Sequence, residues 1–340
     1  MQRSGSSSVT ASTPFQPQDG LHDPNERLSR RVLVFTCLSG AAYLALAVWA
    51  GWQDVLQTML QLGMSAVLIG IAATLLSYLL RFARWTLILK CMGHAPPLKP
   101  SLLIYLGGLA LTATPGKLGE TVRSALLLRF NVPVSTSLAA FFVDRLSDLS
   151  GVLLLAGLTA PRSAMWVLVG LSLAALLSGI ALPILAPTLR QVRCGGRHSA
   201  RVARAADWLA GAAHQIRSAW RPRMFAVLLG VAMIAYGLQG LVFCEYAVRL
   251  WPALDYVPLL HQFLASTLVG AASLLPGGIG AMEASLIALL ANDGVPLTSA
   301  VAAVIAIRAV TLWFGIALGV ASILWSYRHT AASSGAGGSR

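Results

Sequence analysis

The stretch Pro115-Gly116-Lys117-Leu118-Gly119-Glu120 interrupts an apolar segment, and the stretch Pro276-Gly277-Gly278-Ile279-Gly280-Ala281-Met282-Glu283 interrupts another in the second half of the chain. Each closing glutamate is followed 25 residues later by an arginine, Arg145 (120 to 145) or Arg308 (283 to 308). The glutamates are 163 residues apart (120 to 283), and a Val-Pro pair repeats at the same offset. Helices that break at corresponding places in two halves indicate the binding site of a membrane transporter.

The composition is that of a membrane protein. Hydrophobic residues make up 56% of the 340 residues and charged residues 11%, whereas soluble domains are about a quarter charged. The excess of basic residues does not indicate nucleic-acid binding, because these residues gather at the ends of apolar segments and no nucleic-acid motif is present. The four cysteines are widely spaced without a CxxC pair, so they predict neither a disulfide framework nor a zinc site.

Six apolar segments are long enough to cross a bilayer, which takes about 20 residues. They are 32–51, 64–80, 134–160, 163–186, 224–250 and 297–327. Shorter apolar stretches flank each Pro-Gly break and predict two hairpins, 101–114 with 118–130 and 258–275 with 279–291. Irregular backbone at membrane depth must be buried in protein or line a wet cavity. The sequence predicts an all-α polytopic membrane protein with six full transmembrane helices and two broken hairpins, which either dip into the membrane or cross it.

The polar segments divide the chain around one transmembrane domain, residues 32–327. Residues 1–31 and 328–340 are predicted to be disordered cytoplasmic tails. The loop 187–223 carries eight arginines and a single acid, so it should face the cytoplasm. It is either an amphipathic helix on the anionic inner leaflet or an ordinary positively charged loop. Three full spans separate the hairpins, which predicts an inverted repeat with both termini inside.

Two arginines are predicted to lie near the middle of the membrane. Arg145 and Arg308 each follow the start of their helix by 11 residues (134 to 145, 297 to 308). At 1.5 Å per residue this is roughly 16 Å into a hydrocarbon core of about 30 Å. An unpaired arginine there costs at least about 2.5–3.5 kcal/mol. Each of them must therefore face a partner or a cavity.

Candidate partners lie in the same segments, and two interpretations of them stay open. Eight charges of opposite sign sum to zero: Lys117, Arg123, Arg145 and Arg308 against Glu120, Asp144, Asp148 and Glu283. In one interpretation these ion pairs only tie the hairpins to the bundle. In the other the network opens to admit an anionic head group between the arginines. The two aspartates could also hold a metal ion, but the neighbouring arginine favours ion pairing.

The Pro-Gly breaks favour binding. A helix that restarts after Gly119 or Gly280 presents backbone N–H groups and a positive dipole end, which is a site for phosphate-like anions. A tight hairpin tip is the alternative, and the presence of two copies argues against it. The predicted substrate-binding residues are Arg84, Pro115, Gly116, Lys117, Gly119, Glu120, Arg123, Asp144, Arg145, Asp148, Pro276, Gly277, Gly278, Gly280, Glu283 and Arg308.

At these residues the chain resembles the lysylphosphatidylglycerol synthase transmembrane-region family, also called flippase-like membrane proteins. The resemblance covers roughly residues 32–327, and Asp144 stands where the family often has glutamate. The matching stretches are Thr114 to Arg123, Asp144-Arg145-Leu146-x-Asp148, Leu275 to Glu283, Arg84-Trp85, and Arg308 with Trp313. In two-part members this region moves an aminoacylated phospholipid between leaflets, and a separate soluble domain attaches the amino acid.

The resemblance implies a stand-alone lipid transporter of the bacterial cytoplasmic (inner) membrane, because the chain leaves no room for a transferase domain. Its substrate would be a phospholipid, a hopanoid or a polyprenyl-linked lipid. A separately encoded lipid-modifying enzyme is a candidate partner, and no cofactor, metal or nucleic acid is expected. No HExxH, GxSxG or Walker A motif is present, so no catalytic residue is predicted. Two alternatives remain: a membrane-embedded transferase that uses Asp144, Asp148 and Glu120, and a non-catalytic subunit of a lipid-modifying enzyme.

Overall fold

The computed structural model describes residues 52–112, 118–193, 215–216, 221–273 and 275–335, and all regular secondary structure within these ranges is helical. The predicted first span at 32–51, the N-terminal tail, the tip of the first hairpin, most of the basic loop and residues 336–340 lie outside them. Residues 328–335, which the sequence assigned to a disordered tail, are the last residues of helix α12 (Phe314–Gly335). The all-helical fold class is confirmed for the described part of the chain.

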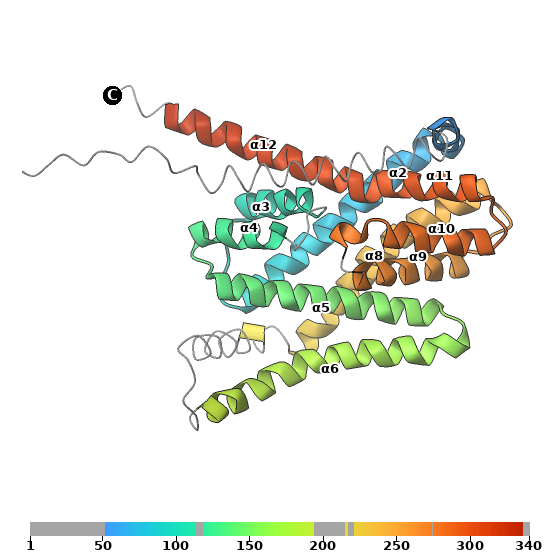
Figure 1. The fold of residues 1–340 in the computed structure, drawn as a ribbon. Helices are drawn as coiled ribbons and strands as arrows, with labels where there is room; N and C mark the ends of the chain where they lie inside the picture. Colours follow the sequence, from blue (N-terminus) through green and yellow to red (C-terminus); the bar gives the residue numbers. More distant parts are fainter. Residues whose placement is uncertain (1–51, 113–117, 194–214, 217–220, 274, 336–340) are drawn as a thin grey trace, which may run out of the picture.

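Helix α2 (Trp52–Cys91) runs through the centre of the molecule, between the two pairs of short helices (Figure 1). It is kinked at Gly63, whose φ of 78° lies in the left-handed region that favours glycine. The helix continues past the predicted end at residue 80. Arg81 and Arg84 therefore lie inside this helix, and Arg84 is buried. Lys90, in the last turn of the helix, is exposed.

Each half of the chain builds a pair of short helices followed by a third helix. The first half has α3 (Leu98–Ala110), α4 (Leu118–Leu127) and α5 (Val134–Thr159). The second half has α9 (Tyr256–Ala272), α10 (Ala281–Asn292) and α11 (Leu297–Arg308). In each pair the two short helices pack on each other. A 3₁₀ turn at Pro276–Gly278 forms the break between α9 and α10.

The backbone repeats at the offset found in the sequence. Helices α4 and α10 start 163 residues apart (118 to 281), as do α5 and α11 (134 to 297). Before α5 and α11 the chain turns through a left-handed residue, Asn131 with φ 57° and Gly294 with φ 87°. In both turns the next residue donates its N–H back into the preceding helix: Val132 to Leu127 O, 3.3 Å, and Val295 to Leu290 O, 3.1 Å. The internal repeat therefore extends from sequence to backbone geometry.

Four helices among the described residues are long and apolar enough to cross a membrane: Leu60–Cys91, Arg162–Gly179, Arg223–Leu250 and Leu297–Ser326. They come from α2, α6 (Arg162–Arg193), α8 (Pro222–Leu250) and the run of α11 into α12 (Phe314–Gly335), and they match four of the six predicted spans. Helix α5 has 26 residues, but every 18-residue window of it contains Asp144, Arg145 and Asp148. Its charges set it apart from an ordinary lipid-facing span.

Two hydrophobic clusters correspond to the two halves. One joins the C-terminal part of α2 to α3, α4 and α5 through Trp85, Tyr105, Leu127 and Val143. The other joins the start of α2 to α8, α9, α10 and α11. Helix α2 contributes to both clusters, so its middle lies where the halves meet.

Candidate functional site

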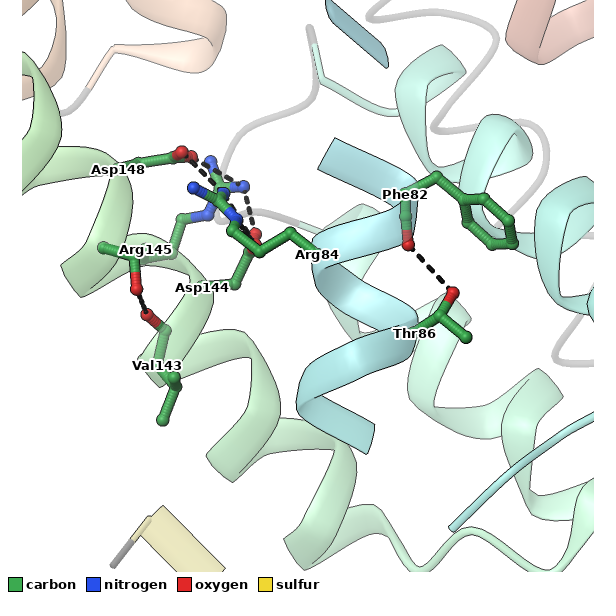
Figure 2. Close-up of polar contacts among 8 residues, drawn as sticks. Phe82, Arg84, Thr86, Val143, Asp144, Arg145 and Asp148 are labelled. Atoms are coloured by element: carbon green, nitrogen blue, oxygen red, sulfur yellow. Dashed lines mark hydrogen bonds and ion pairs between the residues drawn. The ribbon is translucent and has the colours of Figure 1, made fainter. Parts of the chain in front are cut away.

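A buried ion-pair network joins the C-terminal part of α2 to the middle of α5 (Figure 2). The guanidinium of Arg84 lies between two carboxylates: its Nε donates to Asp144 Oδ1 at 2.9 Å and its Nη2 to Asp148 Oδ1 at 2.6 Å. The side chains of Arg84 and Asp144 are fully buried, and that of Asp148 is 5% exposed. Because Asp144 and Asp148 are four residues apart, they face α2 from the same side of α5.

Arg145 completes the network from the side that is open. Its Nη2 lies 2.6 Å from Asp144 Oδ2 and 3.1 Å from Asp148 Oδ2. Its side chain is 39% exposed, in contrast to the buried carboxylates that it contacts. A partly exposed guanidinium in this position is accessible to an anionic ligand.

Two further arginines lie next to this network, each against aromatic rings. The guanidinium of Arg123 is 4.6 Å from the ring centroids of both Trp85 and Tyr105. That of Arg81 is 4.2 Å from the ring of Tyr236, within electrostatic range of Asp148 and Arg145. Cation–π contacts of this kind hold an arginine in a fixed orientation in a site poor in water. We call Arg81, Arg84, Arg123, Asp144, Arg145 and Asp148 the α2–α5 charge cluster.

The second half holds a smaller ion pair at its hairpin break. Arg308 Nε donates to Glu283 Oε1 at 2.6 Å, and the other carboxylate oxygen of Glu283 accepts the N–H of Gly280 at 2.7 Å. Arg308 Nη2 also donates to the carbonyl of Gly277 at 3.3 Å. The start of α10, predicted to be open to an anion, therefore carries the chain's own carboxylate. This differs from the expectation because the glutamate at the third helical position reaches back to its own cap.

The ion pair and the charge cluster are linked through neighbouring residues of α2. The hydroxyl of Tyr78 on α2 donates to the carbonyl of Thr311, in a π-helical turn (Ala309–Trp313) that directly follows Arg308. One turn further along α2 comes Arg81 of the charge cluster. The two hairpins also meet, since a Cβ at Gly277 would lie 3.4 Å from the carbonyl oxygen of Thr112. The predicted site residues of both halves thus converge on the middle of α2.

The structure describes some of the predicted substrate-binding residues fully and others only in part or not at all. It brings Arg84, Arg123, Asp144, Arg145 and Asp148 together, and it pairs Glu283 with Arg308 beside Gly277, Gly278 and Gly280. Pro115, Gly116 and Lys117 lie outside the described residues, and Gly119 and Glu120 are described only as backbone of α4. Sequence reasoning missed Arg81. The signal was present, since Arg81 and Arg84 are three residues apart within one apolar helical stretch and so share a face.

Both aspartates of the cluster are bonded to arginines, so ion pairing accounts for their carboxylates. Within the described ranges no group of three or more His, Cys, Asp or Glu side chains is close enough together to hold a metal ion. The chemistry that this arrangement offers is recognition of an anion by guanidinium groups.

Comparison with known proteins gives one family and no individual relative. No curated protein matches the chain. A family model, described as the lysylphosphatidylglycerol synthase TM region, matches residues 32–319, which include both hairpins, the charge cluster and the Glu283–Arg308 pair. The match confirms the family predicted from the sequence motifs. This multi-pass membrane protein therefore belongs to the family of lysylphosphatidylglycerol synthase transmembrane regions.

Proposed function

We propose that the protein moves an amphiphilic lipid with an anionic head group between the leaflets of the bacterial cytoplasmic membrane. The observation that carries the proposal is Arg145, a half-exposed guanidinium at the edge of an otherwise buried charge cluster. Ionisable residues inside membrane bundles are costly and mark the pathways of substrates and ions. Membership of the lysylphosphatidylglycerol synthase family supports a lipid as the substrate.

The cluster supports a mechanism in which ion pairs are exchanged. A lipid phosphate that approaches Arg145 replaces the weaker of its two aspartate contacts, the 3.1 Å contact to Asp148. Asp148 keeps Arg84 as a partner at 2.6 Å, so its carboxylate is not left unpaired. The head group then crosses within the bundle while the acyl chains stay in lipid. The meeting of both hairpins at α2 suits alternating movement of two halves around one site.

The proposal assigns no catalytic role to the aspartates. Asp144 and Asp148 each accept from Arg84 and contact Arg145, so both carboxylates are engaged in ion pairs. A transferase would need at least one of these groups to accept a proton from its substrate.

Transport by the purified protein in liposomes tests this function. Fluorescent phosphatidylglycerol in the inner leaflet should become accessible to an impermeant quencher added outside, with its mass unchanged. Arg145→Lys keeps the charge but loses the planar fork that grips a phosphate, so the rate should fall at least about tenfold, or about 1.4 kcal/mol of barrier. Arg129→Lys, in the exposed turn after α4, is the matched control and should transport normally.

Two results would overturn the proposal. One is full transport by a well-folded Arg145→Lys protein. The other is a covalently altered lipid that disappears in Asp148→Asn, which would establish the transferase instead.

A further inference from the structure

The two halves of the repeat carry different side chains at equivalent positions. Among the charged residues, only the glutamate and the arginine recur, as Glu120 with Glu283 and Arg145 with Arg308. At the same offset of 163 residues (120 to 283), Arg123, Asp144 and Asp148 have uncharged equivalents in the second half. These pairs are Arg123 and Leu286, Asp144 and Ile307, and Asp148 and Thr311.

The ion pair of the second half has no net charge and is buried. It has one positive and one negative charge, and the side chains of Arg308 and Glu283 are only 8% and 7% exposed. Both carboxylate oxygens of Glu283 are bonded, one to Arg308 and one to the N–H of Gly280, while Arg308 also holds the Gly277 carbonyl. These bonds join α10, α11 and the 3₁₀ turn of the break. The pair acts as a clasp on the second hairpin.

The first half gathers more charged side chains at its site. The α2–α5 charge cluster contains four arginines and two aspartates, whereas the ion pair of the second half contains one arginine and one glutamate.

Two buried nitrogens of the cluster point to an anionic ligand. Nη1 of Arg84 and Nε of Arg81 are inaccessible to solvent, and neither has a hydrogen-bond partner among the residues that the structure describes. The Arg84 side chain is fully buried, and its Nε and Nη2 are already bonded to the aspartates. A phosphate group has oxygens enough to accept from the remaining guanidinium N–H groups.

We propose that the substrate's phosphate binds in one half only, at the α2–α5 charge cluster, and that the Glu283–Arg308 clasp is structural. This inference rests on the proposed function for the lipid nature of the ligand. The asymmetry itself rests on the charges and bonds of the two halves.

Binding to the full-length protein in detergent tests this site without requiring transport. The melting temperature is measured against dioctanoyl phosphatidic acid, a lipid phosphate monoester. It should rise saturably, because a ligand that binds only the folded state stabilises it. Dioctanoylglycerol, which lacks the phosphate, should have no such effect, and an equal rise with it would overturn the anion site. Inorganic phosphate shows whether the ligand is a lipid or a soluble anion. If it does not raise the melting temperature, a lipid ligand is supported. If it raises the melting temperature as much as the lipid does, the lipid ligand is ruled out in favour of a soluble anion.

Matched substitutions test the asymmetry. Arg145→Lys should raise the apparent Kd for dioctanoyl phosphatidic acid at least about tenfold. Arg308→Lys, its repeat equivalent, should lower the melting temperature without ligand and leave the Kd unchanged. If Arg145→Lys does not fold, Arg123→Leu replaces it, because leucine is the residue that the second half carries at this position. A weakened Kd in Arg308→Lys with an unchanged Kd in the first-half variants would overturn the assignment. Saturable binding without transport in liposomes would contradict the proposed function and leave the anion site standing.

Discussion

At the scale of single residues, the repeat is most visible in the turn before the third helix of each half, α5 or α11. Asn131 and Gly294 both have positive φ, 57° and 87°, and both precede a buried valine whose N–H closes the turn. Glycine and asparagine are the residues that adopt this conformation at the lowest cost. The sequence therefore keeps the backbone conformation although it changes the residue.

Replacements at Gly294 should separate backbone strain from packing. A Cβ at Gly294 would meet no heavy atom within 4 Å, so space is not limiting. Gly294→Asn, which copies the first half, should unfold near the wild-type temperature. Gly294→Val should lose about 1–2 kcal/mol, because a β-branched residue is strained at positive φ. Thermal unfolding in detergent measures both, and equal stability of the two variants would refute a left-handed turn.

At the scale of helices, close packing through glycine joins the first hairpin to the end of the chain. Helix α12 lies along α3, where Ser322 Oγ donates to the Leu103 carbonyl at 2.9 Å. A Cβ at Gly319 would lie 2.4 Å from the backbone nitrogen of Ala110. Four residues earlier, a Cβ at Gly315 would collide with the hydroxyl of Tyr78. Small residues at this spacing let membrane helices approach closely.

Gly319→Ala should therefore be destabilising. The atom that its Cβ would meet belongs to the backbone, so α12 and α3 must separate, at a cost of about 1–3 kcal/mol. Gly230→Ala in α8 is the control, since no heavy atom lies within 4 Å of its Cβ. This variant should be neutral or slightly stabilising, because alanine favours a helix over glycine by about 1 kcal/mol. Melting temperatures that fall equally in both variants would show that α12 and α3 are not in close contact.

At the scale of the whole molecule, contacts between distant segments define one end of the bundle. Arg249 at the end of α8 donates to the Leu62 carbonyl near the start of α2, at 3.4 Å. His261 near the start of α9 bonds the Ala156 carbonyl near the end of α5, at 3.1 Å. Gln262 of α9 donates to Asp293 after α10 at 2.6 Å. The far end of α2, with Lys90, lies at the opposite end of the molecule (Figure 1).

Cysteine labelling should show which end faces outward. In a background without native cysteines, Gln61→Cys and Asn292→Cys should react with an impermeant thiol reagent added to intact cells. Lys90→Cys should react only after the membrane is opened, because the positively charged end faces the cytoplasm. All three side chains are exposed, so access across the membrane is the only difference between them. Labelling of Lys90→Cys in intact cells would reverse the orientation and the assignment of the termini.

Local sequence determined the class of protein, the helix starts at Val134 and Leu297, the hairpin break at Pro276–Gly278 and the repeat, because apolar length, Pro-Gly breaks and a constant offset act over short stretches of chain. It also identified most members of the charge cluster. Only the tertiary structure decided which charges pair. Arg84 reaches Asp144 and Asp148 across 60 or more residues of sequence, and Arg81, which sequence reasoning missed, lies beside them. Asn131 and Gly294 show a repeat in the backbone, yet the two halves differ in charge. That difference depends on α2, because α2 supplies Arg81 and Arg84 to the site of the first half and no arginine to the ion pair of the second half.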